Sequence, residues 1–94
     1  MIKKFNEFSV NWSITPNNIY KNSEEHSCRI GKIHLSFNSE NLRLRATIGG
    51  NMAFIGGENR QGYFKSISSI KMFVDENTVE LSKVKTMNSL IRKF

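Results

Sequence analysis

Apolar and polar residues alternate along two segments of the chain, 7–14 and 42–48. Side chains of a β-strand point alternately to its two faces, so each segment predicts a strand with one buried face. The inward residues of the first segment are Phe8, Val10, Trp12 and Ile14. Those of the second are Leu42, Leu44, Ala46 and Ile48, and its outward residues are Arg43, Arg45 and Thr47.

Shorter apolar stretches and polar turns divide most of the remaining chain. Apolar stretches predict further strands at 29–37, 52–55 and 78–81. Polar or glycine-bearing segments predict connections at 23–27, 38–41, 49–51, 56–62 and 75–77. Proline suits the first position of a helix, so Thr15-Pro16 predicts a single helical turn from Pro16 to about Asn22.

Residues 63–74 carry a mixed pattern. Phe64, Ile67, Ile70 and Phe73 recur every third residue, which is typical of a helix. The segment is rich in Ile, Ser and Phe, and its flanks are turn-like, which favours a strand. We interpret it as a strand with a bulge near Ser68-Ser69, with a helix as the alternative.

The C-terminal segment predicts a helix that begins at a cap, Ser82. Its apolar stripe consists of Val84, Met87, Ile91 and Phe94, with Leu90 beside it. Short turns between consecutive strands predict a mainly β, α+β fold: an antiparallel β-meander whose open face the helix covers, or a small closed barrel. With 94 residues, we expect a single domain over 1–94.

Positive charge is the most informative feature of the composition. The chain has 14 Lys or Arg and 8 Asp or Glu, a net charge of +6. The excess is concentrated at residues 29–49, 60–71 and 81–94, and this separation from the acidic turns is expected for a protein with an anionic partner. The same charge would also keep a small protein soluble, and cations near a helix C-terminus also complement the helix dipole.

Arg43 and Arg45 are the main candidates for binding an anion. Residues two apart in a strand share a face, and a guanidinium can bind phosphate oxygens through two N–H groups at once. Tyr63, next to a turn, is a candidate for stacking on bases, whereas Trp12, Phe37 and Phe54 are expected in the core. The predicted binding surface for a nucleic acid or a nucleoprotein complex consists of Arg43, Arg45, Arg60, Tyr63, Lys65, Lys71, Lys83, Lys85 and Arg92.

Residue types for catalysis and metal binding are poorly supplied. His26, Cys28 and His34 match none of the usual zinc spacings, and Cys28 is expected to be a small buried apolar residue. No nucleophile motif is present, so we expect neither an enzyme nor a bound cofactor or metal. The loop Gly56–Gly62 could hold an anion with Arg60, which makes a small anionic ligand a weaker alternative.

A second class of function is open beside nucleic-acid binding. A small domain with no catalytic motif could be an inhibitor from a phage or mobile element, of the anti-defence or anti-CRISPR-like kind, that binds a host protein complex.

The longest apolar run has four residues, Met52–Ile55, and polar residues interrupt the N-terminal segment, so neither a membrane span nor a secretion signal is expected. With one cysteine, the sequence predicts a cytoplasmic protein of a bacterium or a host cell.

Overall fold

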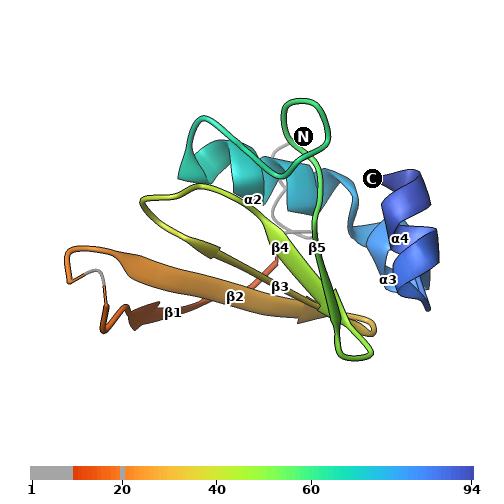
Figure 1. The fold of residues 1–94 in the computed structure, drawn as a ribbon, viewed down its shortest axis with the longest axis horizontal. Helices are drawn as coiled ribbons and strands as arrows, with labels where there is room; N and C mark the ends of the chain where they lie inside the picture. Colours follow the sequence, from red (N-terminus) through yellow and green to blue (C-terminus); the bar gives the residue numbers. More distant parts are fainter. Residues whose placement is uncertain (1–9, 20) are drawn as a thin grey trace.

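The computed structural model describes residues 10–19 and 21–94. Five strands form one antiparallel sheet in the order β1-β2-β3-β4-β5 (Figure 1). Their bounds are β1 Ser13–Pro16, β2 Glu24–Ile30, β3 Ile33–Asn38, β4 Arg45–Ile48 and β5 Asn51–Phe54. The predicted β-meander is therefore confirmed. The alternative of a closed barrel is wrong, because β1 and β5 are not paired with each other and the sheet stays open.

The first strand differs from its prediction in position. Residues 7–9 of the predicted strand lie outside the described residues, and β1 starts only at Ser13. Pro16 is the last residue of β1 and does not begin a helical turn. An edge strand tolerates proline because an N–H that faces away from the sheet needs no partner within it.

The β2–β3 hairpin replaces a predicted loop and a predicted single strand. Segment 23–27 was expected to be a loop because it is polar, but Glu25 to Ser27 pair with strands on both sides and Glu24 pairs with Pro16 of β1. The predicted strand 29–37 is divided by a turn at Gly31, whose φ is +61°. Glycine adopts this left-handed conformation without steric cost, and it also lets the turn approach the backbone of Ser82.

Three helices follow the sheet: α2 Ile67–Glu76, α3 Thr78–Lys83 and α4 Met87–Lys93. The strand interpretation of 63–74 and the predicted strand 78–81 are both wrong. The Ser66 hydroxyl caps α2 by accepting a hydrogen bond from the Ser69 backbone N–H, and the three-residue spacing is the pattern of its buried side. The segment forms a helix despite its strand-like composition, because a helix buries its apolar side against the sheet.

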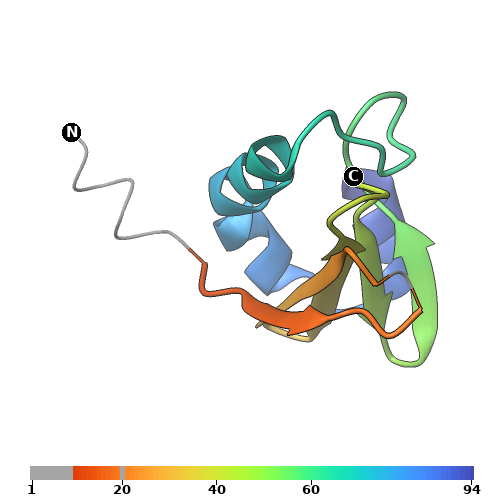
Figure 2. The same cartoon turned by 90° about the vertical axis from the view of Figure 1, so that its left-hand side faces the viewer.

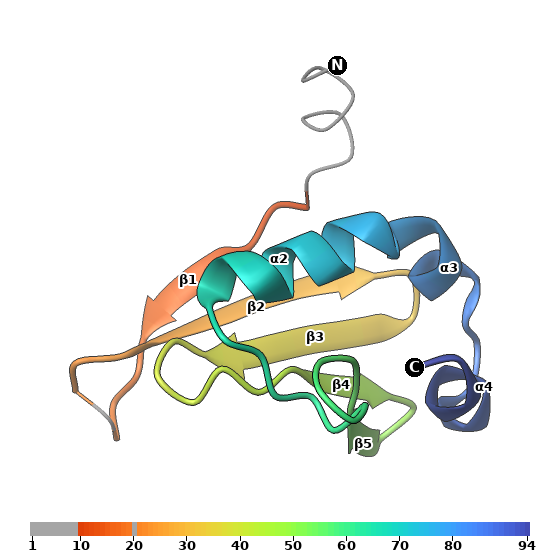
Figure 3. The ribbon, with the colours of Figure 1, turned by 90° about the horizontal axis from the view of Figure 1, so that it is seen from above.

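The core lies between one face of the sheet and these helices. Figure 3 shows α2 lying lengthwise along β2. Alternate strand residues point into this layer, and the fully buried side chains include Ile33, Leu35, Leu44, Ile70 and Leu81. Cys28 is buried here as predicted, and burial raises the pKa of its thiol to about 11, so the thiol stays protonated at neutral pH.

The last helix begins later than predicted. Thr86 caps α4, because its hydroxyl accepts the backbone N–H of Ser89, and Ser82 has no such role. Leu90 is fully buried whereas Ile91 is 51% exposed, so the predicted stripe was wrong at this position. α4 lies at the β5 end of the molecule, and Lys93 is tied to Glu80 of α3 by an ion pair of 2.8 Å (Figure 1).

The second face of the sheet is turned away from α2 and is mostly polar. The strand register places these residues on it, from β1 to β5: Ser13, Thr15, Glu25, Ser27, Arg29, His34, Ser36, Asn38, Arg45, Thr47, Met52 and Phe54. The sheet is strongly twisted, so that β1 and β5 run in clearly different directions (Figure 2).

In the part of the chain that the structure describes, no helix has the length and apolar character of a membrane span.

Candidate functional site

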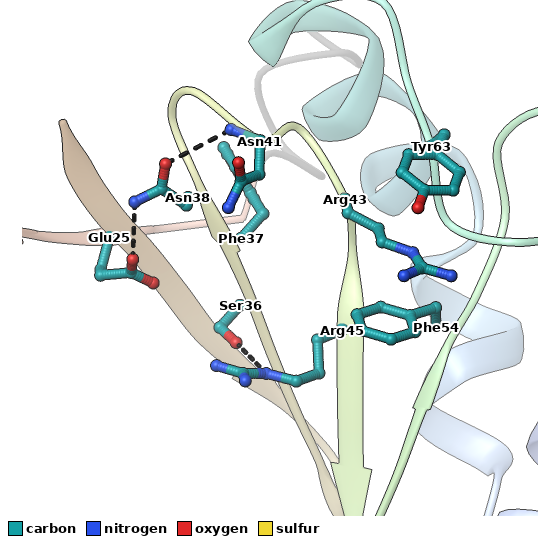
Figure 4. A pocket seen from close by; sticks show the side chains of 9 residues that line it. All are labelled: Glu25, Ser36, Phe37, Asn38, Asn41, Arg43, Arg45, Phe54 and Tyr63. Carbon is teal, nitrogen blue, oxygen red and sulfur yellow. Dashed lines mark hydrogen bonds between the residues drawn. The ribbon is translucent and has the colours of Figure 1, made fainter. Parts of the chain in front are cut away.

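A pocket of about 420 Å³ opens on the polar face of the sheet, between β2 and the loop that follows β5. This volume is within the usual range for small-ligand sites, roughly 300–1,000 Å³. Figure 4 shows the side chains that line it. They are Glu25, Ser36, Phe37, Asn38, Asn41, Arg43, Arg45, Phe54 and Tyr63.

Arg43 is held between two aromatic rings at one side of this pocket. Its guanidinium carbon lies 3.7 Å from the centre of the Phe54 ring and 4.3 Å from the centre of the Tyr63 ring. Its Nε donates a hydrogen bond of 3.0 Å to the Gln61 carbonyl oxygen. The faces of aromatic rings attract cations, so this stack orients the guanidinium before any ligand arrives.

The loop Gly56–Gly62 places Tyr63 in this stack. Tyr63 forms isolated β-bridges with Arg43 and with Glu58, and Gly57 and Gly62 both have positive φ. A Cβ at Gly57 would collide with the Tyr63 carbonyl oxygen, and one at Gly62 would lie 2.8 Å from the Phe54 Cβ. The glycines therefore allow close packing of the loop beside Arg43, a structural role that the sequence alone did not indicate.

Arg45 is exposed on the same face and points in another direction. Its Nε donates to the Ser36 hydroxyl at 3.3 Å, whereas Figure 4 shows the Arg43 head turned toward the two rings. Among the described residues, neither arginine has a carboxylate within salt-bridge distance. Both cations are therefore available to an anionic or hydrogen-bonding ligand.

Glu25 is the one acidic residue of the pocket lining, and it is held in place. Its Oε2 accepts hydrogen bonds from the side-chain amides of Asn17 at 2.6 Å and of Asn38 at 2.8 Å. The Asn38 side chain is itself buried, and its Oδ1 accepts from the backbone N–H groups of Glu40 and Asn41. The turn after β3 thus fixes the position of the carboxylate.

The structure brings together three of the predicted binding residues, Arg43, Arg45 and Tyr63, and not the others. Tyr63 is 49% exposed, as expected for a surface ring. Lys65 pairs with Glu58 at 3.7 Å, and the Lys71 Nζ lies 5.9 Å from the centre of the Trp12 ring. Exposed cations also occur in the helical layer, at Lys83, Lys85 and Arg92.

Arg60 stabilises the end of α4 instead of facing the pocket. Its Nε donates to the main-chain oxygen of Phe94 at 2.9 Å, and its Nη2 donates to those of Ile91 and Arg92 at 3.0 and 3.1 Å. A cation at a helix C-terminus satisfies carbonyl groups that lack partners within the helix. Arg60, the cation that was predicted to hold an anion in the loop Gly56–Gly62, is therefore already bound to main-chain oxygens at the end of α4.

We expect Arg60→Ala to lower the free energy of unfolding by about 1 kcal/mol, because the last carbonyls of α4 lose a charged donor. Urea unfolding followed by circular dichroism measures this. The control is Lys32→Ala, which removes one positive charge from the exposed turn between β2 and β3 and should leave the unfolding midpoint nearly unchanged. Equal midpoints for the two variants would contradict a capping role for Arg60.

Sequence reasoning missed six of the nine residues that line the pocket, among them Glu25 and Phe54. Glu25 was assigned to a loop, and Phe54 was assigned to the core, although it is only half-buried and lies against Arg43. The tight turn at Gly49-Gly50 would have placed Phe54, because it pairs Phe54 with Arg45 on the same face. No local signal places Glu25, since its position depends on Asn17 and Asn38.

The candidate metal ligands His26, Cys28 and His34 are divided between the two faces of the sheet. His26 is buried in the core and stacks on Phe37, with ring centres 4.7 Å apart, whereas His34 belongs to the opposite face of the sheet. Within residues 10–19 and 21–94, no group of three His, Cys, Asp or Glu side chains is arranged to hold a metal ion.

Comparison of the chain with protein-family models, curated proteins and solved structures finds no match.

Proposed function

We propose that this protein binds single-stranded nucleic acid, without catalysis, through the pocket around Arg43, Arg45 and Tyr63. The observation that carries the proposal is the Arg43 stack: a guanidinium held between Phe54 and Tyr63, next to a second arginine that no described carboxylate neutralises. Cations beside exposed aromatic rings are the combination that single-strand binders use.

The two kinds of side chain have complementary tasks in this proposal. The half-exposed ring of Tyr63 offers a surface on which an unpaired base can stack. The N–H groups of Arg43 and Arg45 that have no protein partner can bind phosphate oxygens or base edges. Bases in a duplex already stack on each other, so a ring at the protein surface distinguishes single strands from duplexes.

The distribution of exposed apolar side chains supports nucleic acid over a protein partner. A protein-binding surface would present a contiguous apolar patch. Apart from Tyr63, the exposed large apolar residues that the structure describes lie instead on separate elements: Ile14 on β1, Ile19 after it, Met52 on β5, Met72 on α2, Val79 on α3 and Ile91 on α4. The inhibitor hypothesis therefore has less support than the pocket gives to nucleic acid.

Fluorescence anisotropy with a labelled single-stranded oligonucleotide of mixed sequence tests the proposal. We expect binding at low salt that weakens as salt is added, with a slope of log K against log salt of about −0.7 for each phosphate contacted. The control is the duplex of the same sequence, which should bind more weakly because its bases cannot stack on Tyr63. No binding of the single strand at low salt, or an affinity independent of salt, would contradict the proposal.

A further inference from the structure

We propose that the pocket selects guanine, with Glu25 and Arg45 reading two edges of one unpaired base. This inference rests on the proposed function and adds a base preference to it. It starts from an unexpected residue: a carboxylate repels phosphate, yet Glu25 lines the same pocket as the two arginines. A carboxylate in such a place is useful only if the ligand also presents hydrogen-bond donors.

The hydrogen bonds of Glu25 leave one of its oxygens available. Both amide donors, from Asn17 and Asn38, reach Oε2. No residue that the structure describes makes a hydrogen bond to Oε1. An ionised carboxylate accepts about four hydrogen bonds in all. Glu25 is therefore a positioned acceptor with capacity for a donor that the ligand brings.

Arg45 faces the same space from the other side of β3. Glu25 lies on β2 and Arg45 on β4, and each pairs with a residue of β3, Asn38 and Ser36 respectively. The two flanking strands are two strand spacings apart, about 9–10 Å. The Arg45 guanidinium lies beside Ser36 and the Glu25 carboxylate lies beside Asn38, two residues further along β3 (Figure 4). A flat base placed over β3 between these two side chains would have one edge toward each of them.

Guanine matches this pair of side chains better than the other bases. Its O6 and N7 are two neighbouring acceptors that an arginine binds in a bidentate manner. Its N1–H and 2-amino group are two neighbouring donors on the Watson–Crick edge, which single strands leave open. Adenine and cytosine both present a ring-nitrogen acceptor beside the amino group, where the carboxylate needs a second donor, and uracil has no amino group.

The test compares oligonucleotides that differ at one position within an otherwise all-uridine strand: guanosine, inosine, adenosine or uridine. Inosine lacks only the 2-amino group of guanosine. We expect wild-type protein to bind the guanosine strand about tenfold more tightly than the adenosine and uridine strands, with inosine between. Glu25→Gln should abolish this preference, because the single amide oxygen of the variant is taken by the Asn17 and Asn38 donors, and its NH2 group presents donors where Oε1 accepts.

The matched control is Glu40→Gln, which removes the same charge from the exposed turn after β3 and should keep the preference for guanosine. Equal affinity of wild-type protein for all four strands would overturn the guanine inference and leave the proposed function standing. Absence of binding to every strand at low salt would instead overturn the proposed function. The wild-type comparison of guanosine with inosine tests the inference even if Glu25→Gln does not fold.

Discussion

Replacing Arg43 and Arg45 together by alanine is expected to lower the affinity for a single-stranded oligonucleotide by about 100-fold, because each arginine contact is worth about 1–3 kcal/mol. Arg43 supplies the stacked guanidinium and Arg45 supplies a cation that no described carboxylate neutralises. Anisotropy titrations of wild type and variant at about 0.15 M salt, where the Debye length is about 8 Å, measure this effect.

A matched pair of substitutions separates the pocket from the overall charge. Lys83→Ala with Lys85→Ala removes the same two positive charges from exposed positions in and after α3. We expect this control variant to lose only a few-fold in affinity, because long-range charge alone contributes weakly at moderate salt. If both double variants lose the same affinity, the net charge binds the nucleic acid and the pocket has no special part in it.

The Arg43 substitution needs its own check, because that side chain also packs against Phe54 and Tyr63. Arg45→Ala alone provides it, since the only described contact of this side chain is the hydrogen bond to Ser36. We expect the single variant to keep the wild-type melting temperature and to lose about tenfold in affinity. A lower melting temperature without a change in affinity would assign Arg45 a structural role.

Leu90→Ala is expected to destabilise the protein by about 3 kcal/mol, whereas the neighbouring Ile91→Ala should cost under about 1 kcal/mol. Leu90 is fully buried, so its truncation leaves a cavity in the core, while half of the Ile91 side chain already meets solvent. Urea unfolding curves of both variants measure the difference. Similar unfolding midpoints would mean that α4 does not pack through Leu90.

Leu90 and Ile91 also show a limit of predicting burial from the spacing of apolar residues. A stripe of Val84, Met87, Ile91 and Phe94 assumes one continuous helix, but Val84 lies in the connection between α3 and α4. Once the helix begins at Thr86, the side that meets β5 is centred on Leu90. An error of a few residues at a helix start therefore changes which of two neighbouring residues is buried.

A strand was predictable from the sequence where apolar residues on one face alternate with polar residues on the other. Leu44, Ala46 and Ile48 are buried as their alternation with Arg45 and Thr47 required, and the turn at Gly49-Gly50 adopts positive φ at both glycines. Segment 23–27 was not predictable, because its polar residues belong to a strand whose outer face meets solvent and whose backbone is satisfied by two neighbours. Such pairing depends on residues that are distant in the sequence.

Local pattern alone was sufficient for the alternation of side chains in β4 and for the antiparallel order set by short turns. The predicted strand 42–48 was too long at its start, because β4 covers only Arg45–Ile48 and Leu42 has a positive φ. The alternation and the antiparallel order follow from nearest-neighbour geometry, since a strand alternates its side chains and a short turn reverses it. Packing in three dimensions decided that Ile67–Glu76 and Thr78–Lys83 form helices, that Arg60 supports α4, and that Glu25 shares a pocket with the arginines. The physical reason is that burial against a sheet and hydrogen bonds between remote residues outweigh local preference, and neither is encoded in any short stretch of the chain.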